Sequence, residues 1–130
     1  MGKYWKLLGL YNAESTTYSA CAGTAQTSPY TPIETATLVG LRVIVSADSA
    51  ATLTEGVQFK VTSSTFKPNS IEVMGQGIGI ATAPRIEGGI TDYAVNQPVA
   101  AGVPITVEAR NVTADTPVGV SVLLMGCFTS

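Results

Sequence analysis

The segment Val57-Gln58-Phe59-Lys60-Val61-Thr62 decides the fold, because apolar and polar residues alternate along it without a break. A period of two places successive side chains on opposite faces of a β-strand, whereas a helix requires a period of 3.6 residues. Valine, phenylalanine and threonine are also residues that strands favour. We therefore predict a strand here, with its two valines and Phe59 on the buried face.

The residues that follow predict the partner of this strand. Placing Phe59 opposite Val73 brings apolar residues together on one face, and the same register sets Lys60 against Glu72 on the other. A slip of one residue would invert both faces, so a register that satisfies both is more informative than propensity alone. We predict an antiparallel hairpin with its turn in residues 63–70.

Three further segments alternate in the same way: Val39–Val45, Ile105–Arg110 and Val118–Leu124. The last two can also be paired by hand, with Val107 opposite Val122, and their connection contains the turn residues Asp115 and Pro117. This pairing predicts a second hairpin.

The fold class follows from these strands and from what accompanies them. No window of eleven residues carries an apolar stripe of helical period, so helix is expected to be essentially absent. Adding a strand at Tyr4–Tyr11 and a short one at Ile90–Val95 brings the expected total to about eight strands. We therefore predict an all-β fold, an antiparallel β-sandwich of the jelly-roll kind.

Residues 1–32 differ in composition from residues 33–130, which are predicted to form the β-sandwich domain. The first part is expected to be a strand with Trp5, Leu7 and Tyr11 on one face, followed by an extended arm rich in serine, threonine and alanine. Connections of that length are usually functional. A strand on such a tether can pair with its own sheet or with a neighbour's edge, and we expect it to act between subunits.

Composition and charge exclude several classes of function. Charged residues make up 12% of the chain and apolar residues 45%, which excludes a disordered tail. The chain has no histidine, so histidine-dependent catalysis and metal ligation are not expected. Lys3 and Lys6 are the nearest approach to a basic cluster, and the longest apolar stretches are well short of the roughly 20 residues of a spanning helix. We expect neither a nucleic-acid nor a membrane partner, and no secretory leader.

The two cysteines, Cys21 and Cys127, lie near opposite ends of the chain. A disulfide between them would close a long loop and contribute about 4–5 kcal/mol in the chain-entropy picture. Two separate buried thiols are the alternative, and folding in the cytoplasm favours them.

Three short motifs are candidate functional sites. The glycine-rich run Gly75–Gly79 lacks the helix that a nucleotide-binding loop needs, so a closely packed or bulged strand is favoured. Glu87 and Asp92, beside Arg85, are expected to be solvated loop charges rather than an acid–base pair or a weak calcium site. The sequon Asn111–Thr113 is read as a turn. No catalytic, cofactor-binding or metal-binding residue is assigned.

The closing strands Val103–Arg110 and Val118–Cys127, their connection Asn111–Pro117 and the arm Asn12–Pro32 resemble those of virion structural proteins. These are jelly-roll capsid subunits and β-sandwich decoration (cement) proteins of bacterial and archaeal viruses. The resemblance implies a non-enzymatic subunit that forms a symmetric homo-oligomer, such as a trimer or pentamer, and contacts other shell proteins in a virion assembled in the host cytoplasm. The arm carries no lysine or arginine, which favours a shell-stabilising role over genome binding.

Aromatic and apolar side chains of the N-terminal segment are the candidate subunit contacts, since tyrosine and tryptophan are favoured interface anchors. They are Tyr4, Trp5, Leu7, Tyr11, Tyr18 and Tyr30. For Trp5 the alternative is a place in the core. Two other functions stay open: an extracellular filament subunit that donates its first strand, and a carbohydrate- or receptor-binding sandwich that uses the loops Arg85–Asp92 and Asn111–Asp115.

Overall fold

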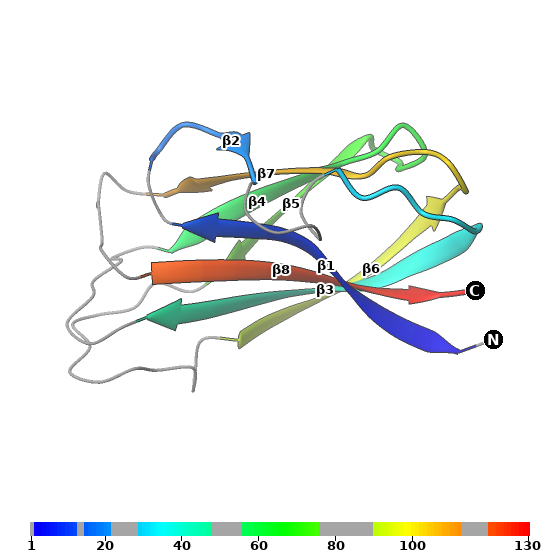
Figure 1. Cartoon of the computed structure of the whole chain (residues 1–130), viewed down its shortest axis with the longest axis horizontal. Coiled ribbons are helices and arrows are strands. Elements are labelled where there is room, and N and C mark those ends of the chain that lie inside the picture. The colour runs from blue at the N-terminus through cyan, green and yellow to red at the C-terminus, as the bar shows by residue number, and fades with distance from the viewer. Residues whose placement is uncertain (1, 13–14, 22–28, 48–55, 76–89, 113–119) are drawn as a thin grey trace.

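The computed structural model describes residues 2–12, 15–21, 29–47, 56–75, 90–112 and 120–130. Within them the chain forms two four-stranded antiparallel sheets and no helix, and Figure 1 shows the sheets as two stacked layers. The strands are β1 (Lys3–Asn12), β2 (Ser19–Ala20), β3 (Ala36–Ala47), β4 (Val57–Thr62), β5 (Ser70–Gly75), β6 (Ile90–Val99), β7 (Thr106–Asn111) and β8 (Val120–Thr129). The prediction of an all-β sandwich is confirmed. In the described part of the chain no helix is long and apolar enough to cross a membrane.

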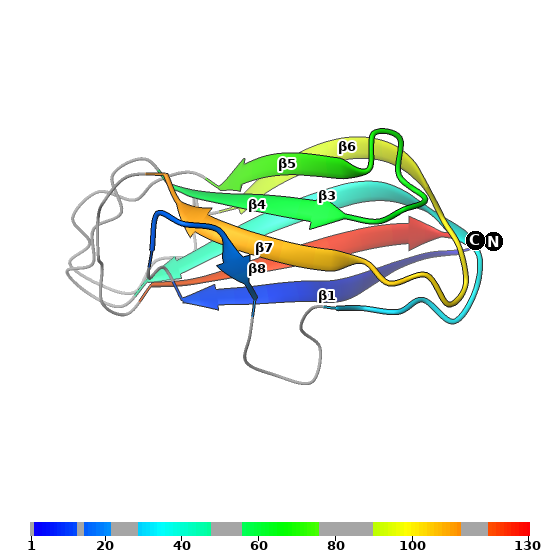
Figure 2. The same ribbon diagram turned by 90° about the horizontal axis from the view of Figure 1, so that it is seen from above.

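The connectivity follows from how the two halves of the chain pair. Sheet A has the strand order β1-β8-β3-β6, and sheet B has the order β2-β7-β4-β5 (Figure 2). Each strand of the first half pairs with one of the second half, β1 with β8, β2 with β7, β3 with β6 and β4 with β5. The chain therefore folds back on itself at the β4–β5 hairpin. Successive strand pairs along this doubled chain belong alternately to sheet A and sheet B, which is jelly-roll-like connectivity.

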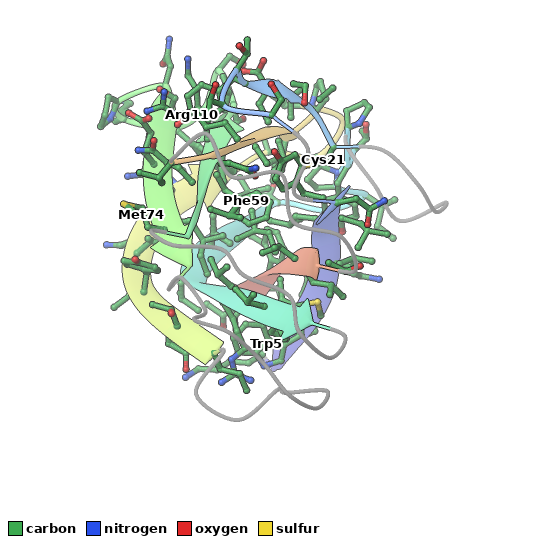
Figure 3. The ribbon with its side chains drawn as sticks, turned by 90° about the vertical axis from the view of Figure 1, so that its left-hand side faces the viewer. Trp5, Cys21, Phe59, Met74 and Arg110 are labelled. Carbon is green, nitrogen blue, oxygen red and sulfur yellow. The ribbon has the colours of Figure 1, made fainter. Side chains whose placement is uncertain are left out.

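The hairpin predicted around Phe59 is present in the predicted register. Phe59 lies opposite Val73 and Lys60 opposite Glu72, and both members of the apolar pair are buried. Figure 3 shows Phe59 between the two sheets. The two faces of the hairpin thus fixed its register, as the sequence indicated.

The second predicted hairpin is wrong, because β7 and β8 lie in different sheets. Val107 pairs with Val61 of β4, whereas Val122 lies between Tyr11 of β1 and Val45 of β3. Alternation marks the buried face of a strand but does not name its neighbour, and any two alternating strands can be drawn in a register. The turn residues Asp115 and Pro117 and the start of that segment at Val118 lie outside the described residues.

Two irregularities reverse the side-chain faces within sheet A. The register shifts between Leu7 and Gly9 in β1, and between Leu38 and Gly40 in β3. A bulge adds one residue to a strand, so the inward positions change parity across it. Leu8 and Leu38 are therefore buried. The prediction that Trp5 and Leu7 share the face of Tyr11 is wrong for this reason. The alternation along Val39–Val45 likewise predicted Val39 on the same face as Leu41 and Val43, but Val39 lies before the shift in β3 and is not buried with them.

The N-terminal segment is built into its own sandwich. Strand β1 pairs with β8 along its length, and Leu8 and Tyr11 enter the core. Further along, the Cys21 N–H donates to the Val107 carbonyl at 3.1 Å, and Tyr30 exchanges two backbone hydrogen bonds with Ile105. Of the two pairings open to the first strand, the structure contains the one with its own sheet.

Strand β6 is longer than predicted, and its side chains make hydrogen bonds to sheet B along one side of the sandwich. It continues past the predicted end at residue 95 to Val99, and it tolerates Pro98 because it is the edge strand of sheet A. The Tyr93 hydroxyl donates to the Met74 carbonyl at 2.6 Å and accepts from the Met74 N–H at 3.1 Å. The Gln97 amide makes a similar pair of hydrogen bonds with the Lys67 backbone. Two side chains of β6 thereby occupy backbone groups at the edge of β5 and in the turn before it.

Candidate subunit-contact surface

The outer face of sheet A carries an unbroken row of apolar side chains, one from each strand. Leu10 lies opposite Leu123, Leu123 opposite Ile44, and Ile44 opposite Ile90. Opposed residues of antiparallel strands point to the same face. That face is the outer one, since the residues on either side of these in β3 and β8 are buried in the core. We call Leu10, Leu123, Ile44 and Ile90 the apolar row.

The next row across the sheet combines apolar side chains with one neutralised charge pair. Its members, in strand order, are Leu7, Met125, Arg42 and Asp92. The Arg42 guanidinium donates to both carboxylate oxygens of Asp92, at 2.7 and 3.1 Å. Hydrogen bonding to Arg42 lowers the pKa of Asp92, and the same bond raises the pKa of Arg42. The pair thus places no net charge beside the apolar row.

A shallow depression of about 420 Å³ lies at the Trp5 end of this face. Trp5 lies opposite Cys127, which lies opposite Gly40, and a glycine there leaves the floor without a side chain. The Arg42 guanidinium carbon lies 4.7 Å from the centre of the Trp5 ring, a cation–π contact. Trp5 is 43% exposed and does not fill the core, and Figure 3 places it on the far side of sheet A from Phe59.

Three of the other candidate residues are engaged inside their own chain. Tyr11 is 5% exposed, and its hydroxyl lies 2.9 Å from both the Asn111 side-chain oxygen and the Ser15 carbonyl. Tyr4 stacks on Phe128 with ring centres 5.6 Å apart, and Tyr30 is tilted against the same ring at 5.9 Å. These three tyrosines therefore pack within their own sandwich.

Tyr18 lies on the outer face of sheet B, where it bridges three strands. Its ring contacts Arg110 of β7 at 4.8 Å and Lys60 of β4 at 5.6 Å, while its hydroxyl donates to Glu72 of β5 at 2.6 Å. Burial, together with this hydrogen bond to a carboxylate, raises the pKa of Tyr18 to about 12. The outer face of sheet B is thus polar, and its strands are connected there by the contacts of Tyr18.

Of the six candidates, then, only Trp5 and Leu7 lie together on an outward apolar surface. Leu10, Ile44, Leu123 and Met125 share that surface and were not predicted from the sequence. The signal was available, because Ile44 and Leu123 are apolar residues at the outward positions of alternating strands, where a strand with one solvated face carries polar residues.

Both cysteines are free thiols, so the disulfide considered above is not formed. Cys127 lines the depression outside sheet A. Cys21 lies against Gly9 and Val107, where burial raises the pKa of its thiol to about 12. The structure contains the alternative of two separate buried thiols.

The remaining motifs have structural explanations where the chain is described. A Cβ on Gly75 would lie 2.5 Å from a methyl carbon of Val43, so glycine permits close packing of β5 on β3. Asn111 of the sequon ends β7 and is fully buried, so it belongs to a strand and not to the predicted turn. Glu87, Arg85 and residues 76–79 lie outside the described residues. In the described ranges no three His, Cys, Asp or Glu side chains gather as a metal site.

Comparisons with known proteins add little to this geometry. No protein-family model matches the chain, and no curated protein matches it. Among solved structures, the cryo-EM structure of the virus-like particle of giant freshwater prawn Macrobrachium rosenbergii extra small virus is similar with a TM-score of 0.28 and 17% identity. That match covers 99% of this chain and 78% of the other. A likeness this slight carries no argument about function.

Proposed function

We propose that this protein is a non-enzymatic structural subunit of a virion, a small capsid or decoration protein that assembles symmetrically and stabilises the particle shell. Its partners are copies of itself and other shell proteins. The subunit contact is assigned to the outer face of sheet A.

The observation that carries the proposal is that sheet A carries apolar side chains on its outer face as well as on its core face. An antiparallel sheet with one solvated face normally alternates apolar inward and polar outward residues. Sheet B follows this rule, with Lys60, Glu72 and Arg110 outside. Sheet A departs from it, with the apolar row and Trp5 outside, and Trp5 and Ile90 are 43% and 49% exposed. Contiguous exposed apolar surface is typical of a protein–protein contact.

Fold and composition agree with a structural role. Jelly-roll sandwiches are used by viral capsid proteins and by lectins, so the fold permits the proposal without selecting it. The absence of histidine from the sequence removes the commonest general base, which is why the proposal is non-enzymatic.

Electron microscopy of the purified full chain tests the proposal. The wild-type protein is expected to form closed regular particles, or to coat shells made by co-expressed viral capsid proteins. Leu123→Lys places a charge in the apolar row and is expected to abolish both. Met74→Lys makes the same kind of change on the outer face of sheet B, where Met74 is 39% exposed, and should leave assembly intact.

Two results would overturn the proposal. Open filaments whose growth requires the first strand would support a strand-donating filament subunit instead. A protein that stays monomeric and binds defined sugars on a glycan array would support the carbohydrate-binding alternative.

A further inference from the structure

We propose that the occupant of the apolar row is the same row of a second copy, in a two-fold symmetric contact between two sheets A. This inference rests on the proposed function, because it names the partner of that surface.

The size of the face suits one such partner. Four strands spaced about 4.8 Å apart make a sheet about 19 Å wide. Strand β1 has ten residues and at about 3.3 Å per residue extends about 33 Å. The projected face is therefore about 600 Å², and side-chain relief brings its accessible area close to the ~800 Å² per partner of a standard interface. One sheet face of a second copy fills it.

The order of residues in the row is self-complementary. Leucines lie on β1 and β8, and isoleucines lie on β3 and β6. A two-fold axis that runs along the strands and passes between β8 and β3 exchanges the two halves of the sheet. Leu123 of one copy then packs on Ile44 of the other, and Leu10 packs on Ile90. Leucine and isoleucine have equal volumes, so the two halves of the row match in size, as a contact of one patch with itself requires.

Charge selects sheet A of the second copy over its sheet B. The outer face of sheet B carries Lys60, Glu72, Glu108 and Arg110. Covering these charges with the apolar row would remove them from water without new partners, which is costly. In the sheet A contact, by contrast, the charges flanking the row are Arg42 and Asp92, which already satisfy each other at 2.7 Å.

Sedimentation velocity on the full chain tests the contact. We expect a dimer, or larger species with an even number of copies, at micromolar concentration. Ile44→Lys and, separately, Leu123→Lys are expected to weaken dimerisation at least 100-fold, while circular dichroism keeps the wild-type sheet signal. Met74→Lys is the control and should sediment as wild type.

Combining the variants tests the two-fold pairing itself. A mixture of Ile44→Lys chains with Leu123→Asp chains should recover a mixed dimer, since the axis brings these positions together. Failure of the mixture to associate, or dimers that persist in both single variants, would overturn the inference.

Electron microscopy separates this inference from the proposed function. Particles formed equally by wild type and Ile44→Lys contradict the sheet A contact alone. Row-dependent dimers that never build or coat a particle contradict the virion role alone. A wild-type chain that remains monomeric at high concentration contradicts the two-fold contact, and it contradicts the virion role as well if the chain also fails to coat co-expressed shells.

Discussion

Leu8 and Leu38 illustrate how a single residue redirects a strand. Each lies at a register irregularity, and each is fully buried. Without the irregularity in β1, Trp5 and Leu7 would point into the core together with Tyr11. With it, those two side chains face outward and join the apolar row, while Tyr11 remains inside. The outward position of Trp5 and Leu7 on the candidate contact surface therefore depends on one added residue in β1.

Truncating Phe59 and truncating its neighbour Lys60 should have very different costs. Phe59 is fully buried, so Phe59→Ala should destabilise the fold by about 3–5 kcal/mol. Lys60 points outward, so Lys60→Ala should cost less than about 1 kcal/mol. Urea unfolding of both variants measures this, and equal small losses would mean that the face of β4 has been assigned backwards.

Tyr18 should titrate later than an ordinary tyrosine. Its pKa is raised to about 12, so the folded state favours the protonated phenol. The stabilisation is complete below the ordinary pKa of about 10 and is lost as the pH rises toward 12. Tyrosinate absorbance recorded against pH for wild type minus Tyr18→Phe should show a midpoint near 12. A midpoint near 10 would show that neither the burial of the Tyr18 hydroxyl nor its bond to Glu72 persists in solution.

At the scale of elements, the edge of β5 is protected by side chains of β6. An exposed edge strand offers unpaired backbone groups to any other strand. Tyr93 and Gln97 of β6 occupy such groups at Met74 and Lys67, so the β5 edge is protected by side chains of the other sheet. No additional strand is needed for this protection, because β6 is already the edge strand of sheet A.

Removing the Tyr93 hydroxyl should release this edge. Tyr93→Phe keeps the ring but loses two hydrogen bonds to Met74, with an expected cost of about 1 kcal/mol. The freed edge should also increase strand-mediated aggregation on heating, measured by thermal unfolding and light scattering. Ala94→Ser changes the adjacent outward position of β6 and serves as the control. A Tyr93→Phe protein that melts and aggregates as wild type would show that the edge needs no protection.

Deleting residues 1–30 should prevent the monomer from folding. The deletion removes the whole of β1 with its pairing to β8, and it removes the buried side chains of Leu8 and Tyr11, each worth about 1.5–3 kcal/mol. We expect no cooperative transition in circular dichroism, whereas removal of residues 1–2 alone should change little. A truncated domain that unfolds cooperatively would show instead that the first strand serves a neighbouring subunit.

For the molecule as a whole, the sandwich has two unlike outer faces. Sheet B presents charged side chains joined by Tyr18, and sheet A presents the apolar row beside one neutralised pair. A contact made through sheet A is therefore expected to depend on apolar burial and not on charge.

Salt separates these two kinds of contact. Raising the ionic strength from about 0.15 M to about 1 M shortens the Debye length from about 8 Å to about 3 Å and weakens exposed charge pairs. We expect the assembly to survive this change and to tighten in sulfate, which favours apolar burial. Sedimentation in the two salts measures it, and dissociation in 1 M sodium chloride would assign the contact to charged groups.

The class of fold and the β4–β5 hairpin could be predicted from the sequence alone. Alternation along β3, β4, β7 and β8 identifies strands because a period of two is a local property of the backbone, readable without any neighbour. The register of β4 on β5 was also readable, because Lys60 and Glu72 constrain the polar face while Phe59 and Val73 constrain the apolar one.

The identity of neighbouring strands, and the apolar row on the outer face of sheet A, could be read only from the folded structure. Val107 and Val122 can be placed opposite each other in a hairpin register, yet they belong to opposite sheets. An alternating pattern indicates that a side chain is buried in the core, but it does not indicate which strand lies beside it. Trp5, Leu7 and the apolar row come from four strands that are far apart in the chain. They share a surface only because these strands pair in sheet A and because the register of β1 shifts between Leu7 and Gly9. Pairing between distant segments is a property of the folded whole, so no local pattern could have assembled that surface.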